Sequence, residues 1–122
     1  MERPQPKGPA NGEVGARRAK IEQLLAIDPS DVFLRYALAL ELVNDGEVDR
    51  GLAILTSLSK APTRYIPAFH MAGRHLATAG RFDEARGMLR EGIELAREKG
   101  ESHAAAEMAE LLVSLGDVGE QV

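Results

Sequence analysis

The 122-residue sequence contains no cysteine and no tryptophan, and aromatic residues make up only 4% of it. Without cysteine the chain can form no disulfide framework, no thiolate nucleophile and no thiolate metal site. No apolar run approaches the roughly 18 residues that a membrane-spanning helix needs, and the N-terminus lacks the apolar core of a signal peptide. We therefore expect a cytoplasmic protein with no membrane partner.

The balance of charge excludes a further class of partner. The formal net charge is −4, which gives the molecule no cationic surface of the kind that nucleic acid attracts. Hydrophobic residues make up 44% and charged residues 28%, as is typical of a folded globular domain. Because aromatic residues are scarce, the core must consist of aliphatic residues and alanine, which favours closely packed helices.

The residues along the chain predict three parts. Prolines and glycines dominate residues 1–12, which we predict to be a disordered N-terminal tail. Residues 13–116 are expected to form the helical domain, and residues 117–122 a frayed C-terminus. Within the domain Asp28 is predicted to cap the second helix and Ser102 the last one. The expected helices cover residues 13–27, 29–44, 48–60, 67–79, 82–99 and 103–115.

The helical segments repeat with a period of 34 residues. Gly12, Gly46 and Gly80 fall in register, and each is expected to lie at a turn between helices. After an insertion of two residues, Gly116 continues the series. Such a period predicts stacked helix pairs. Apolar residues in register are expected to fill the layer between helices: Leu38, Leu42, Leu55, Leu58, Leu76, Phe82, Leu89, Ile93 and Met108.

The best copy of the repeat resembles the tetratricopeptide repeat (TPR). It carries Phe69, Ala72, Gly73, Leu76, Gly80, Phe82, Ala85 and Leu89 in the order that this family uses. The resemblance implies an all-α, TPR-like α-solenoid of about six helices, with two full helix–turn–helix repeats flanked by half repeats. It also implies that Ala39, Gly73 and Ala109 lie where paired helices cross closely.

In the TPR family the first helix of each pair lines a concave groove that binds a peptide or a helix of a partner. The resemblance implies ten groove residues here: Phe33, Tyr36, Leu40, Asn44, His70, Arg74, Thr78, His103, Ala106 and Glu110. His70 and Arg74 are one helical turn apart, so together they could hold an acidic side chain or a C-terminal carboxylate. A solvated face without a ligand is the alternative interpretation of the same residues.

The histidines do not form a pattern typical of metal binding or catalysis. His70 and His75 are five residues apart on one expected helix, so their side chains diverge, and no third ligand is evident. Nor does the sequence contain a nucleophile–base motif or a phosphate-binding glycine loop. We expect no metal, no cofactor and no catalytic residue.

Three functions remain in order of preference. The first is a non-catalytic protein–protein interaction module, an adaptor, scaffold or co-chaperone-like protein, with a small secretion-type chaperone as a variant. The second is a structural protein that forms homo-oligomers through its terminal helix faces, where Val14, Ile21 and Leu112 or Val113 would stack between copies. An enzyme is the remote third.

Overall fold

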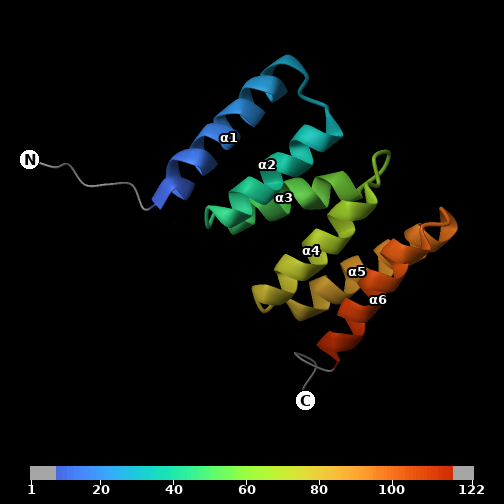
Figure 1. Cartoon of the computed structure of the whole chain (residues 1–122). Coiled ribbons are helices and arrows are strands. Elements are labelled where there is room, and N and C mark those ends of the chain that lie inside the picture. Colours follow the sequence, from blue (N-terminus) through green and yellow to red (C-terminus); the bar gives the residue numbers. More distant parts are fainter. Residues whose placement is uncertain (1–7, 117–122) are drawn as a thin grey trace, which may run out of the picture.

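The computed structural model describes the backbone of residues 8–116 and the side chains of residues 15–116. The described chain forms six α-helices and contains no strand (Figure 1). The predictions of an all-α fold and of six helices are therefore confirmed for this part of the chain. The helices are α1 (Gly8–Ile27), α2 (Val32–Asn44), α3 (Val48–Ser59), α4 (Ile66–Thr78), α5 (Phe82–Glu98) and α6 (Ser102–Leu115).

Helix α1 begins earlier than the sequence indicated. It starts at Gly8, inside the segment 1–12 that was expected to be a tail, so Gly12 lies within a helix and not at a turn. Proline is tolerated in the first turn of a helix, because the amide that it lacks has no intrahelical partner there. Pro9 therefore does not oppose this start. Residues 1–7 and the expected frayed C-terminus at 117–122 lie outside the described residues.

Two predicted helix caps were wrong. The N-cap of α2 is Asp31 and not Asp28: the Asp31 side chain accepts a hydrogen bond of 2.9 Å from the amide of Leu34. A capping side chain must face the amides of the first turn, and Asp28 precedes a separate turn before that point. Ser102 is the first residue of α6, whose N-cap is Glu101 without a side-chain cap bond.

The turns after α2 and α4 have the same backbone geometry. Gly46 and Gly80 take φ values of +91° and +81°, which residues with a side chain rarely adopt. In both turns the glycine amide donates to a carbonyl three residues earlier, at 3.0 Å, and the next amide donates to one five residues earlier, at 2.8 Å. The expected turns at these two glycines are confirmed. The turn after α5 at Gly100 has the same pattern, with bonds of 3.1 and 2.8 Å, so the pattern ends helices both inside and outside the 34-residue register.

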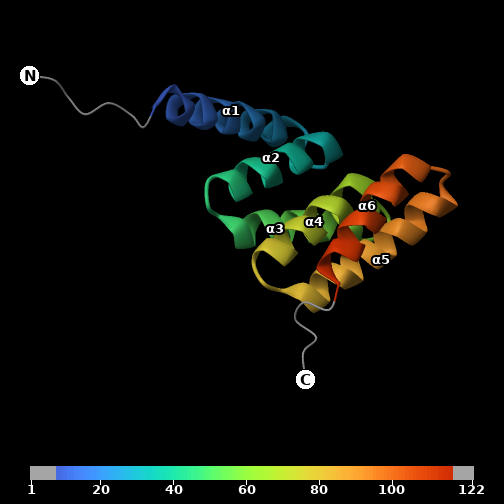
Figure 2. The same ribbon diagram turned by 60° about the horizontal axis from the view of Figure 1, so that its bottom comes forward.

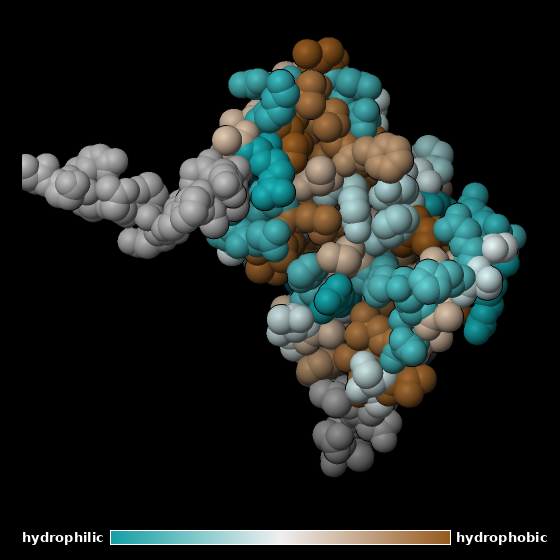
Figure 3. Space-filling view, in the orientation of Figure 1, coloured by the Kyte–Doolittle hydropathy of each residue, from teal (hydrophilic) through white to brown (hydrophobic). Residues whose placement is uncertain are grey.

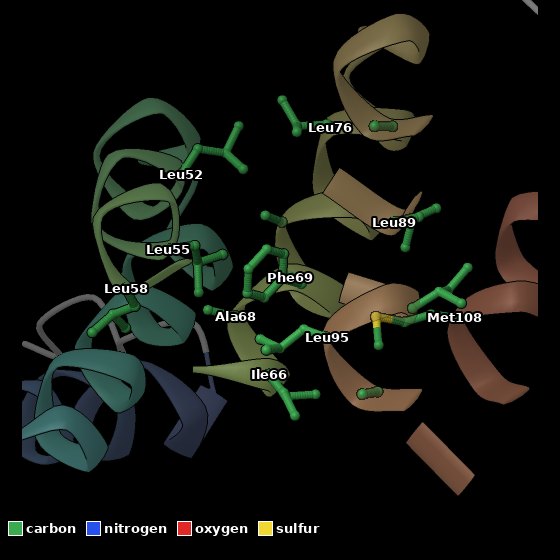
Figure 4. Close-up of a cluster of buried hydrophobic side chains, with 14 of the residues drawn as sticks. Leu52, Leu55, Leu58, Ile66, Ala68, Phe69, Leu76, Leu89, Leu95 and Met108 are labelled. Atoms are coloured by element: carbon green, nitrogen blue, oxygen red, sulfur yellow. The ribbon is translucent and has the colours of Figure 1, made fainter. Parts of the chain in front are cut away.

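The hydrophobic core lies mainly between α3, α4, α5 and α6 and is aliphatic except for Phe69 (Figure 4). Most of the residues expected to fill the layer are buried; Leu38 and Phe82 are only half-buried. A Cβ at Gly73 would lie 2.6 Å from Cγ and from Cδ2 of Leu89. Helices α4 and α5 therefore approach closely at Gly73, as the sequence indicated.

The helices follow one another through space in chain order, from α1 at one end to α6 at the other (Figures 1 and 2). Each helix contacts the next, and α4 also contacts α6. Successive helix pairs therefore lie side by side, and α1 and α6 each have fewer helical neighbours than α4.

Two arginines separated by twice the 34-residue period tie helix ends together. Arg18 of α1 donates hydrogen bonds to Asp45 at 2.9 Å and to Glu47 at 3.0 Å, in the turn between α2 and α3. Arg86 of α5 is buried and donates to the carbonyl of Gly116, at the end of α6, at 3.3 Å. Each arginine thus holds the end of the helix that follows its own.

Candidate functional site

The ten residues predicted to line the groove lie on α2, α4 and α6, and none of them is fully buried. We call their side chains together the predicted face. Seven are exposed and three, namely Tyr36, Leu40 and His70, are half-buried. Hydrophobic surface is visible at the tip where α1 joins α2 and in several other places (Figure 3). Ile27 at the end of α1 is 82% exposed, and Phe33 of α2 is 72% exposed.

Two residues of the predicted face on α2, Phe33 and Tyr36, form an aromatic patch together with Tyr65. The ring of Tyr65, which directly precedes α4, meets Phe33 at 6.0 Å and Tyr36 at 5.3 Å between centroids, both edge to face. Burial raises the pKa of both tyrosines, and for Tyr36 the neighbouring Tyr65 adds to the effect. The patch is therefore an apolar surface that carries two neutral hydroxyl groups.

Tyr65 was missed by the sequence analysis. One period earlier in the chain lies Asp31, a helix cap, so the register alone assigned Tyr65 no side-chain role. The contact depends on how α2 and the start of α4 meet in space. No signal in the sequence could have shown that.

The middle of the predicted face consists of His70, Arg74 and Thr78 on α4. The Thr78 hydroxyl donates to the Arg74 carbonyl at 3.1 Å, so it serves its own helix. Within residues 15–116 the Arg74 guanidinium has no ion-pair partner, and it is exposed. Arg74 can therefore bind a carboxylate through two parallel hydrogen bonds.

The residues of the predicted face on α6 make no specific side-chain contact with those on α2 and α4 in the described chain. His103 lies 3.4 Å from Glu107 of the same helix, and both side chains are exposed. Between α6 and the residues of the face on α2 or α4, the described chain contains no hydrogen bond, ion pair or ring contact of side chains. The aromatic patch and Arg74 are therefore the parts of the predicted face with a defined chemistry.

His75 is half-buried, as His70 is, but the two lie five residues apart on α4. At 100° per residue their side chains leave the helix about 140° apart, so His75 points away from His70. Burial, and then the charge of Arg74, lower the pKa of His75 below its ordinary 6.5. In the part of the chain that the structure describes, no group of three or more His, Asp or Glu side chains is placed to hold a metal ion. None of the described helices is long and apolar enough to cross a membrane.

A groove that the sequence did not indicate lies between α3 and α5, and we call it the α3–α5 groove. It has a volume of about 870 Å³. A second hollow of about 330 Å³ continues it past Met88 and Glu91, which line both. Leu52, Ala53, Leu76 and Met88 supply the apolar lining of the larger part; Asp49, Arg81, Glu84 and Glu91 supply the charges.

Comparison with known proteins assigns no relative to this chain. No family model matches the sequence, and neither a curated protein nor a solved structure shows a significant match.

Proposed function

We propose that this chain is a non-catalytic protein–protein interaction module with a TPR-like α-solenoid fold. In this proposal it acts as an adaptor or co-chaperone-like protein in the cytoplasm, without a cofactor, and binds a peptide or helix of a partner across the predicted face. The 34-residue register of the sequence supports the repeat assignment, and the turns at Gly46 and Gly80, both with positive φ, lie one period apart.

The observation that carries the proposal is the aromatic patch. Phe33 leaves 72% of its surface exposed while its ring packs edge to face against Tyr65. An aromatic side chain held in place yet open to solvent loses little conformational entropy when a partner covers it. Aromatic and arginine side chains also dominate the binding energy of protein interfaces. The patch with Arg74 on α4 supplies both kinds.

The chemistry of the face defines the partner. Phe33, Tyr36 and Tyr65 suit apolar or aromatic side chains, whose burial is favourable at roughly 25 cal/mol per Å². Arg74, which has no ion-pair partner in the described chain, suits an acidic side chain or a C-terminal carboxylate. We therefore propose a partner segment in which an apolar stretch adjoins a carboxylate.

Affinity capture from a cell lysate tests the proposal. The test variant is Tyr36→Ala/His70→Ala/Arg74→Glu, and its helicity is confirmed by circular dichroism. The matched control is Arg90→Glu, because Arg90 is also exposed and without an ion pair among the described residues, but lies on α5. A partner retained by the wild type and the control but lost by the triple variant supports the proposal. A partner retained by all three chains contradicts it.

Self-association is the second candidate, favoured by exposed apolar residues on the two terminal helices. Ile27 of α1 is 82% and Val113 of α6 is 77% exposed, and Leu112 is half-buried. Ile21 is buried against its own chain and cannot contribute, while the side chain of Val14 lies outside the described residues. Sedimentation equilibrium tests this candidate: a mass that rises with concentration in the wild type but not in Val113→Glu supports it.

A further inference from the structure

The α3–α5 groove lies on a different side of α4 from Arg74. Successive residues of a helix are rotated by 100° about its axis, so the directions of Leu76, which lines the groove, and Arg74 differ by about 160°. The groove continues past Phe69, which is buried and about 140° from Arg74. A ligand in the α3–α5 groove would therefore not contact the predicted face.

The two ends of the groove carry opposite net charge. At the end where α3 and α5 begin, Arg81 donates to Glu84 at 2.7 and 3.0 Å and lies 3.9 Å from Asp49, so two carboxylates share one cation. The hydrogen bond from Arg81 lowers the pKa of Glu84, which keeps this carboxylate ionised. This end has an excess of one negative charge.

At the other end Lys60 and Arg64 lie near a single carboxylate, Glu91. None of these three forms an ion pair within residues 15–116. Arg64 also takes a φ of +41°, a left-handed conformation that is uncommon outside glycine and is found at functional sites. This end has an excess of one positive charge.

A glycine in the wall of the groove has no structural reason to be a glycine. Gly87 lies inside α5, where glycine is less favourable than alanine. A Cβ at this position would meet no atom within 4 Å, and the φ of Gly87 is not positive. Packing and backbone geometry would both accept alanine, but any side chain at residue 87 would take space from the groove.

The distance between the charged ends defines the length of the ligand. Asp49 lies in the first turn of α3 and Lys60 directly follows its last residue, so the two are eleven residues apart, which is about 16 Å at 1.5 Å per helical residue. An extended chain covers the same distance in about five residues, at roughly 3.3 Å each. A volume of about 870 Å³ is within the range of pockets that enclose small ligands.

We propose that the α3–α5 groove is a second binding site, which takes an extended partner segment of about five residues. The segment carries a basic residue at the end near Asp49 and Glu84, an acidic residue at the end near Lys60 and Arg64, and apolar side chains between them. This site is independent of the predicted face, so either assignment can fail without the other.

Capped synthetic pentapeptides test the proposal. Three libraries share the same apolar middle positions and differ at the ends: Lys and Glu, Lys at both ends, or Glu at both ends. Binding to the full chain is followed by amide chemical shifts, and affinity by isothermal titration calorimetry. We expect shift changes at Leu52, Gly87 and Met88, and about tenfold tighter binding of the Lys/Glu library.

Two variants locate the site and its charge. Gly87→Leu should abolish binding, while Gly15→Leu should not, because Gly15 is an exposed helical glycine on α1 whose Cβ would also meet no atom. Lys60→Glu/Arg64→Glu should reverse the preference towards the library with Lys at both ends. Circular dichroism confirms that each variant is folded.

Each outcome decides the proposal. Shift changes in the groove together with a preference for the Lys/Glu library support it. Shift changes confined to Tyr36 and Arg74 would overturn it and leave the predicted face as the binding site. Equal affinity for the three libraries, unchanged binding by Gly87→Leu, or no binding at all would overturn it as well.

Discussion

The substitution Gly73→Ala tests the close approach of α4 and α5. A Cβ added at Gly73 would lie 2.6 Å from Cγ and Cδ2 of Leu89, and 3.3 Å from its Cδ1. Carbon atoms are in ordinary contact at about 3.5–4.0 Å, so the helices or the leucine must move by roughly 1 Å. Leu89 is fully buried, and its branch carbon cannot swing away as the end of a flexible chain could. The new methyl group therefore overpacks the core.

The substitution Gly87→Ala provides the matched comparison for the size of this effect. Both glycines lie inside helices, so replacement by alanine gains a similar amount, about 0.5–1 kcal/mol, at each position. At Gly87 this gain is the expected net effect, because a Cβ there meets no atom. At Gly73 overpacking costs about 1–3 kcal/mol. The difference between the two alanine variants should thus be about 1–3 kcal/mol.

Urea denaturation followed by helical circular dichroism measures the difference in the free energy of unfolding. We expect the free energy of unfolding of Gly87→Ala to be higher than that of the wild type. That of Gly73→Ala should be equal to or lower than the wild-type value, and that of Gly73→Leu lower still. In a Leu89→Ala background the space is vacant, so Gly73→Ala should become stabilising. Equal stability of Gly73→Ala and Gly87→Ala, or an unchanged effect in the Leu89→Ala background, would refute the close contact.

Three further substitutions probe single interactions. Burial and Arg74 depress the pKa of His75 in the folded state, so on acidification the unfolded chain binds this proton first. The stability that neutral His75 allows is therefore fully present above about pH 6.5 and is lost as the pH falls through the depressed pKa. In His75→Gln the urea midpoint should lose this part of its pH dependence. Arg86→Ala should cost about 1–3 kcal/mol and speed amide exchange near Gly116, because the helix end loses its donor. Arg18→Ala should raise amide exchange in α1, and by less at high salt.

Several features of the fold were predictable from local chemistry. The turns at Gly46 and Gly80 require a positive φ, and glycine is the residue that adopts it without strain. The close crossing at Gly73 follows from the repeat, because a small residue recurs where paired helices meet. Local rules with a fixed spacing thus specify helices, turns and packing faces.

Other features depend on distances that the sequence does not contain. The α3–α5 groove is lined by residues of α3 and α5, with Leu76 of α4 between them. The distance between α3 and α5 creates the groove, and the pattern of apolar residues does not fix that distance. The contact of Tyr65 with Phe33 and Tyr36 joins residues of two different helix pairs. The cap at Asp31 was misassigned because an aspartate followed by proline at 28 and 29 satisfies the same rule.

Photo-crosslinking tests the central claim, that the aromatic patch binds a partner, most directly. A benzophenone amino acid is placed at Phe33 in one chain and at Val113 in another, because both side chains are largely exposed but lie on α2 and α6. After irradiation in a cell lysate, the proposed function predicts a crosslink from residue 33 to a different polypeptide and none from residue 113. Crosslinks from residue 113 alone, or crosslinks only to a second copy of the same chain, would contradict it.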